Sequence, residues 1–151
     1  MKKFHFPLER VLTFRRLQRD LERAALEKSL GEVRRIEELA QEVRREAEAT
    51  ARDVISRSPD EPLDGTQLGG LDGYQHYLKR VAHDVEVHRQ RAETAASQQR
   101  QKLVEAERRM KVLEHLQERA RDEWKHALSK EVEDLAAEAF LARRVREGPP
   151  G

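Results

Sequence analysis

Residues 58–73, SPDEPLDGTQLGGLDG, divide the chain and decide its fold. This stretch contains Pro59, Pro62 and four glycines, which are the residue types that most often interrupt regular structure. Pro59 also disfavours the α conformation at Ser58, the residue before it. The stretch therefore predicts a turn-rich connector over residues 58–73.

Long periodic segments lie on both sides of this connector. We predict a first helix over about residues 7–57 and a second over about residues 74–146. Pro7 suits the first turn of a helix, where its missing N–H would be unpaired in any case. Asp72 is the expected N-cap of the second helix, and Gln75 three residues later completes a variant of the capping box.

The composition is that of a thin helical protein. Charged residues make up 39% of the 151 residues and hydrophobic residues only 37%, which is too polar for a thick core. The 30 basic and 29 acidic residues nearly balance, whereas highly charged disordered chains usually carry a large net charge. The absence of cysteine excludes disulfides and thiolate metal sites. We also expect no signal peptide and no membrane span, because no long uncharged apolar run occurs.

Apolar residues recur in steps of three and four along both helices, which is the pattern of a coiled coil. In the first helix the stripe slips in phase between Ala25 and Leu30. Its two parts are Leu8, Val11, Phe14, Leu17, Leu21 and Ala24, then Val33, Ile36, Ala40, Val43, Ala47, Thr50 and Val54. The second helix carries Tyr74, Leu78, Val81, Val85, His88, Ala92, Ala96, Gln99, Leu103, Ala106, Met110, Leu113, Gln117, Ala120 and Trp124, and continues through Leu128, Val132 and Leu135 to Phe140.

Two long helices joined by one connector predict an all-α fold, a single antiparallel coiled-coil hairpin over residues 1–151 with a longer second helix. Helix geometry predicts that paired residue numbers sum to roughly 129, which places Trp124 beside Phe4. The predicted clamp at this end consists of Phe4, Phe6, Leu8, Val11, Leu12, Leu113, Leu116 and Trp124. Residues 128–146 then have no partner in the first helix, and an unburied apolar stripe implies a binding partner.

No catalytic constellation is visible, so we expect a protein that is not an enzyme and that has no cofactor. GTQLGG lacks the lysine and the strand-to-helix context of a phosphate-binding loop. No two histidines have the i, i+4 spacing that places two imidazoles on one helical face, and no metal site is predicted. His83, Asp84 and His88 could touch a metal, but a surface helix is the favoured interpretation. Nucleic-acid binding is disfavoured, because basic residues alternate with acidic ones.

Two segments resemble the flagellar export protein family FliJ. FHFPLERVLTFRR at residues 4–16 is similar to the opening of that family, Phe-x-Phe-x-Leu-x-x-Val-Leu-x-x-Arg. KVLEHLQERARDEWKHALSKEVEDLAAEAFLARR at residues 111–144 resembles its C-terminal part. The matching residues in this segment are Leu113, Leu116, Arg119, Glu123, Trp124, Leu135, Phe140, Arg143 and Arg144.

The resemblance implies a non-enzymatic component of the flagellar type III protein export apparatus. Such a protein acts as a central stalk for the export ATPase hexamer and contacts the export gate protein and export chaperones. It implies a monomer in the cytoplasm, associated peripherally with the inner membrane through the apparatus, without direct membrane insertion and without nucleic acid. The implied ATPase-binding residues are Arg15, Arg16, Arg119, Arg143 and Arg144, and the implied gate-facing residues are Tyr74, Tyr77, Leu78 and Val81.

Two alternatives remain open at this point. The chain could be the stalk protein of a virulence-type secretion system, which pattern alone barely separates from the flagellar one. It could also be a structural coiled-coil protein that dimerises in parallel, with the second helix packed against its twin.

Overall fold

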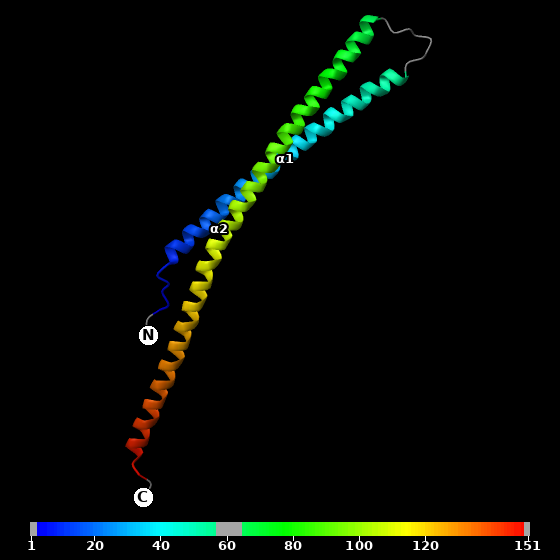
Figure 1. Cartoon of the computed structure of the whole chain (residues 1–151). Coiled ribbons are helices and arrows are strands. Elements are labelled where there is room, and N and C mark those ends of the chain that lie inside the picture. The colour runs from blue at the N-terminus through cyan, green and yellow to red at the C-terminus, as the bar shows by residue number, and fades with distance from the viewer. Residues whose placement is uncertain (1–2, 57–64, 150–151) are drawn as a thin grey trace. The chain divides into compact units, whose positions relative to one another are not determined.

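The computed structural model describes residues 3–56 and 65–149, and these contain two long helices and no strand (Figure 1). Helix α1 spans Glu9–Ser56 and helix α2 spans Gly65–Glu147, with 48 and 83 residues. The two helices pack against each other, which confirms the predicted all-α hairpin with a longer second helix.

The predicted connector is too long, because α2 begins at Gly65 rather than near residue 74. Asp72 does not cap the helix, since it lies inside α2 and pairs with His76 one turn later at 3.6 Å. A glycine costs a helix only about 1 kcal/mol relative to alanine, so glycines alone do not stop one. Leu71 is half-buried, and it extends the apolar stripe of α2 one step before Tyr74. Residues 58–64, the rest of the predicted connector, lie outside the described residues.

The described helix ends have local causes. The Glu9 N–H donates to the Phe6 carbonyl at 3.1 Å, and the Leu12 N–H donates to the Leu8 carbonyl at 2.9 Å, so a turn at Pro7 and Leu8 leads into α1 at Glu9. At the other end, α2 stops at Gly148, whose φ of 69° is the left-handed conformation typical of the residue after a helix. Only glycine adopts this conformation without steric cost.

The helix pair divides into two compact units. The first unit joins residues 3–19 to residues 105–149, and Phe6, Leu12 and Met110 form its buried cluster. The second joins residues 20–56 to residues 65–104. Its buried apolar residues are Ile36 and Val43 of α1 with Leu78, Val85 and Ala96 of α2.

The pairing register of the second unit differs from the predicted one. Glu22 meets Gln99 and Glu46 meets Tyr74, so paired numbers sum to 121 and 120 instead of roughly 129. The earlier start of α2 at Gly65 accounts for this difference. In the first unit the sum is 128 where Phe4 meets Trp124. The sum is larger here because residues 3–6 precede α1. A non-helical residue covers up to about 3.3 Å, whereas a helical residue covers about 1.5 Å, so these few residues lie beside a longer stretch of α2.

The first half of α1 faces α2 with a different side from the predicted one. Leu12 is fully buried, whereas Phe14 and Leu17 are 53% and 55% exposed. The contact line can be followed from Val33 toward the N-terminus in alternating steps of four and three residues. The buried or half-buried positions on it are Ser29, Leu26, Glu22, Arg19, Arg15 and Leu12. A continuous helix keeps one phase against its partner, so the apolar stripe before the slip turns outward. The prediction that Val11, Phe14, Leu17 and Leu21 pack on α2 is wrong.

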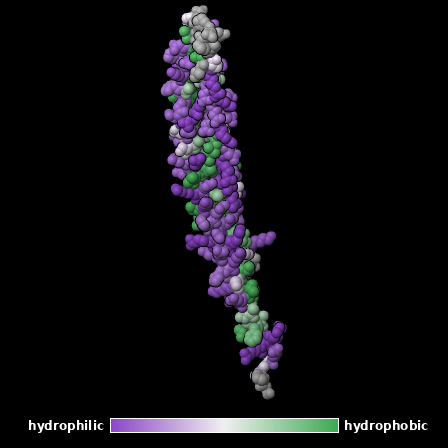
Figure 2. Space-filling model, turned by 90° about the vertical axis from the view of Figure 1, so that its right-hand side faces the viewer, coloured by the Kyte–Doolittle hydropathy of each residue, from purple (hydrophilic) through white to green (hydrophobic). Residues whose placement is uncertain are grey.

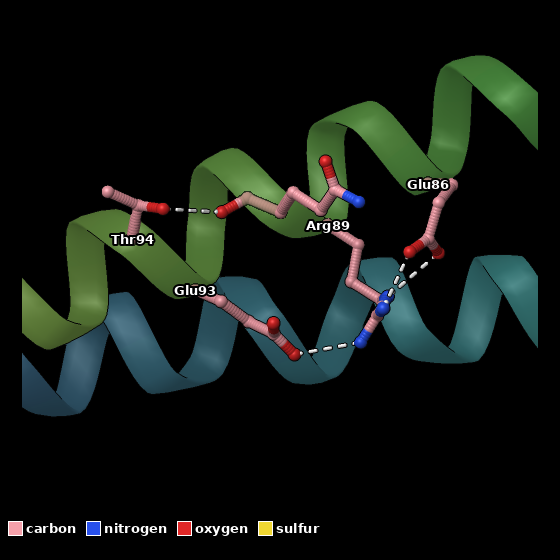
Figure 3. A network of polar contacts seen from close by, with 5 residues as sticks. Glu86, Arg89, Glu93 and Thr94 are labelled. Carbon is pink, nitrogen blue, oxygen red and sulfur yellow. Dashed lines mark hydrogen bonds and ion pairs between the residues drawn. The ribbon is translucent and has the colours of Figure 1, made fainter.

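An arginine occupies the position in α2 where the prediction placed His88. His88 is exposed and Arg89 is half-buried, so the stripe runs from Val85 through Arg89. Figure 3 shows the Arg89 guanidinium between two carboxylates: its Nη2 lies 2.6 Å from Oε1 of Glu86, and its Nη1 lies 2.9 Å from Oε1 of Glu93. The hydrogen bond from Arg89 lowers the pKa of Glu86, and the same bond raises the pKa of Arg89.

Two leucines of α1 test the phase of the helix. Leu12→Ala is expected to lower the free energy of unfolding by about 2 kcal/mol or more, because it removes a fully buried side chain. Leu17→Ala, the matched control on the same helix, is expected to change it by less than about 0.5 kcal/mol, since Leu17 is exposed. Urea unfolding of dilute protein measures both values. Equal losses would contradict the phase described above.

The Glu86 carboxylate predicts a pH dependence. The pKa of Glu86 is lower in the folded chain than in the unfolded chain, where it is near 4.5. The ionised carboxylate therefore stabilises the folded chain above pH 4.5, and this stabilisation is lost as the pH falls through the lower pKa of the folded chain. We expect the melting temperature of Glu86→Gln to lie below that of the natural chain at neutral pH and to approach it in acid. Thermal melts at both pH values test this, and a gap that persists in acid would exclude the ion pair as its cause.

Candidate interaction surface

The sole tryptophan fixes the segment that precedes α1. The rings of Phe4 and Trp124 lie 5.9 Å apart at an angle of 59°, a tilted arrangement that aromatic pairs favour. The Arg121 guanidinium carbon lies 5.4 Å from the centre of the Phe4 ring. Phe6 is buried beside Leu12 and Met110. Phe4 is thus held on α2 by aromatic and cation–π contacts, and Phe6 by apolar packing.

Three residues of the predicted clamp lie at the surface. Phe4 and Leu113 pack against the buried cluster of Phe6 and Leu12, and Trp124 closes it beyond Phe4. Leu8, Val11 and Leu116, however, are 39%, 40% and 41% exposed. Val11 precedes the buried Leu12 by one residue, a rotation of about 100° around the helix, which removes it from the contact with α2. These three residues flank the clamp and do not fill it.

The C-terminal part of α2 extends past α1. Every residue from 129 to 149, which we name the overhang, is exposed, and Leu128 is the last half-buried position. Steps of four and three lead from Leu128 to Val132 and Leu135, so the stripe that faces α1 continues where α1 has ended. Figure 2 shows hydrophobic surface on this narrow segment. Its large apolar residues are Val132, Leu135, Phe140, Leu141 and Val145.

The structure does not bring the five candidate arginines together. Arg15 donates to Gln18 at 2.9 Å, and Arg16 pairs with Glu114 at 3.5 Å, so both already take part in contacts of the clamp region. Arg119, Arg143 and Arg144 are exposed. The last two lie 24 residues or more beyond Arg119, which is about 36 Å along a helix. Arg144 belongs to the last turn of α2, where positive charge is favoured by the helix dipole.

The four gate-facing candidates have different environments. The Tyr74 hydroxyl donates to the Glu46 carboxylate, which raises the pKa of Tyr74, and its ring stacks on Tyr77 at 6.3 Å. Leu78 is buried and Val81 is half-buried, so both serve the contact between the helices. Tyr77 is the exposed member of the set.

A groove of about 400 Å³ lies beside Leu78. Small side chains on both helices leave this space open. Its lining residues are Ala40, Val43, Arg44, Ala47, Gln75, Leu78, Lys79, Ala82 and Glu86. The groove therefore combines an apolar floor with charged residues from each helix.

Metal and membrane features are absent from the part of the chain that the structure describes. Within residues 3–56 and 65–149, no cluster of three or more potential ligands could hold a metal ion, and His83, Asp84 and His88 form no such group. In the same ranges neither helix has a stretch apolar enough to cross a membrane. Comparison of the chain with family models, with curated proteins and with solved structures finds no match.

Sequence reasoning missed one surface. The sequence assigns a set of apolar residues at the start of α1 to the helix contact, yet the structure exposes them. We name them the outer stripe: Leu8, Val11, Phe14 and Leu17, of which Leu8 directly precedes α1. The slip in the apolar pattern between residues 25 and 30 could have indicated this surface. A continuous helix turns the apolar residues before and after such a slip to different sides, so only one of the two runs can face α2. The first unit therefore carries two exposed apolar surfaces, the outer stripe and the overhang.

The aromatic pair can be tested by fluorescence. Phe4→Ala is expected to shift the emission of Trp124 to longer wavelength and to cost about 1 kcal/mol of stability, because it removes the tilted ring contact. His5→Ala is the control, since His5 is the exposed neighbour. Unchanged emission in Phe4→Ala would show that the segment before α1 does not rest on Trp124.

Proposed function

We propose that the chain is a non-enzymatic component of the flagellar type III protein export apparatus, in which it acts as a central stalk for the export ATPase ring. The observation that carries the proposal is the overhang. Up to Glu147 it is a single helix, the end of α2, and it exposes apolar side chains as well as arginines. The resemblance of residues 4–16 and 111–144 to the FliJ family supports the same function.

A stalk needs stiffness and asymmetry rather than catalytic groups. The clamp of Phe4 and Trp124 supports a stiff base, because it holds the start of the chain on α2 next to the overhang. A ring of ATPase subunits that grips one helix meets a different set of side chains on each side of it. Such differential contact couples the ATP-binding states of the subunits to the orientation of the helix.

The proposed partners follow from this role. The ATPase hexamer would contact the overhang through Arg143 and Arg144, while Tyr77 is the gate-facing candidate with the most accessible ring. Export chaperones are further partners. The protein would act in the cytoplasm and associate peripherally with the inner membrane through the export apparatus. A virulence-type system remains the second candidate, and the ATPase that binds the chain distinguishes the two.

The proposal predicts binding to the export ATPase and faster ATP turnover in the presence of the chain. Arg143→Glu with Arg144→Glu is expected to weaken this binding about tenfold or more, because it reverses two exposed charges of the overhang. Calorimetric titration and an ATPase assay measure the two effects. Arg80→Glu with Arg91→Glu, which reverses two exposed charges elsewhere on α2, should leave both unchanged. Absence of binding by the natural chain would overturn the stalk role.

A further inference from the structure

The overhang carries a second face besides the stripe that continues toward α1. Steps of three and four residues along the end of α2 place six exposed side chains in one line, within about 100° of the helix circumference. Phe140 lies five residues after Leu135, a rotation of about 140°, so this line points to a different side from the stripe. We name the line the end face, and its residues are Lys130, Glu133, Ala137, Phe140, Arg144 and Glu147.

The charges of the end face complement the same face when it is reversed. From its N-terminal to its C-terminal end the face reads basic, acidic, small, large, basic and acidic. In an antiparallel pair of helices the first position of such a line faces the last, and the second faces the fifth. Lys130 then faces Glu147 of the other copy, and Glu133 faces Arg144. Both pairs have residue numbers that sum to 277, so one register satisfies them together.

The same register satisfies the apolar centre of the face. Ala137 faces Phe140 of the other copy, again with a sum of 277, so each large ring meets a small side chain. A shift of the register by one heptad would instead place Phe140 opposite Lys130 or Arg144. A parallel pair would place each charged residue opposite its own copy, and facing like charges are costly. The charges therefore select the antiparallel arrangement and a single register.

This register also fits the ends of the overhang. It pairs residue 129 with residue 148, so the overhang of one copy lies along the overhang of the other over nearly its whole length. Leu128, the last half-buried residue of α2, lies level with Pro149 of the other copy. The contact of Phe4 with Trp124 lies outside this overlap. The pairing therefore leaves the contact of α1 with α2 intact in both copies.

No contact within the chain occupies the charges of the end face. In the part of the chain that the structure describes, its four charged side chains form no hydrogen bond or ion pair. Phe140 is 61% exposed. Glu147 is the last residue of α2, where the helix dipole disfavours a carboxylate, so a lysine that another chain brings near it is favoured.

We propose that a second copy of this chain binds the end face, in a symmetric antiparallel dimer formed by the two overhangs. Each copy supplies the same face, so the contact is isologous and closes after two chains. Each pair of facing charges and each contact of alanine with phenylalanine forms twice, once on either side of the two-fold axis. Val132 and Leu135 remain exposed on the other side of each overhang.

The dimer is separate from the proposed stalk role and competes with it. Arg144 belongs both to the end face and to the proposed contact with the ATPase ring. A chain in the dimer therefore cannot offer this residue to a ring, and dissociation of the dimer and capture by the ring would be linked equilibria. The dimer forms from the chain alone, so its absence would leave the binding of the ATPase to its own titration.

Charge reversals on the end face test the dimer. Glu133→Arg places a positive charge opposite Arg144 of the other copy, and Arg144→Glu places a negative charge opposite Glu133. Each change alone is expected to weaken dimerisation about tenfold or more, because it joins like charges in two symmetric contacts. The chain that carries both changes should dimerise like the natural chain, since the facing charges are opposite again. Sedimentation equilibrium over a range of protein concentrations at low ionic strength measures each sample.

Two matched controls lie on the far side of the same helix turns. Glu131→Arg and Arg146→Glu each reverse an exposed charge two residues from the tested one, a rotation of about 200°. Both should dimerise like the natural chain. Phe140→Ala should weaken the dimer without loss of helix content by circular dichroism, because Phe140 is exposed within the chain.

An equimolar mixture of Glu133→Arg and Arg144→Glu adds a further check. Both contacts of the mixed dimer join opposite charges, so the mixture should dimerise although neither variant does so alone. A natural chain that stays monomeric would leave the end face to a different partner and would overturn the proposal. Single variants that dimerise normally, a double variant that stays monomeric, or controls that weaken the dimer equally would overturn it as well.

Discussion

A straight helix can face its neighbour with only one side, and the rest of this structure depends on that constraint. In the second unit the contact side of α1 is set by Ile36 and Val43, whose side chains are buried against α2. The same phase, followed toward the N-terminus, leads to the buried Leu12. The apolar residues one position away from this line are consequently exposed. The outer stripe is exposed because the regular apolar run that includes Ile36 and Val43 fixes which side of α1 is buried.

The polar residues on the contact line follow from the same constraint. Polar residues on the seam, such as the half-buried Glu22 and Gln99, pair with each other, because withdrawing a polar group from water without a partner costs free energy. Gln99 donates to the Glu22 carbonyl at 3.2 Å and to its carboxylate, and Gln117 donates to the Glu9 carboxylate at 2.8 Å. Polar contacts at seam positions cost stability and fix the register of the two helices. A slipped register would separate these partners.

The overhang and the clamp together define what the first unit can bind. The contact of Phe4 with Trp124 lies near the end of the paired part of the unit, and the apolar stripe of α2 is exposed over residues 129–149. Acidic residues surround the first half of this stripe, and arginines follow near Gly148. One exposed helix therefore offers two chemically different segments, of which one suits a basic apolar surface and the other an acidic one.

The sequence by itself determined the two helices, the hairpin, the contact of Phe4 with Trp124 and the exposed overhang. Helical periodicity, the prolines near residue 60 and the unequal helix lengths are local features, so they can be read without knowledge of the partner surface. The tertiary structure alone decided the start of α2 at Gly65, the register of the second unit and the side of α1 that is buried. Two apolar stripes competed for one contact face, and only the packing of α1 on α2 determines which of them is covered.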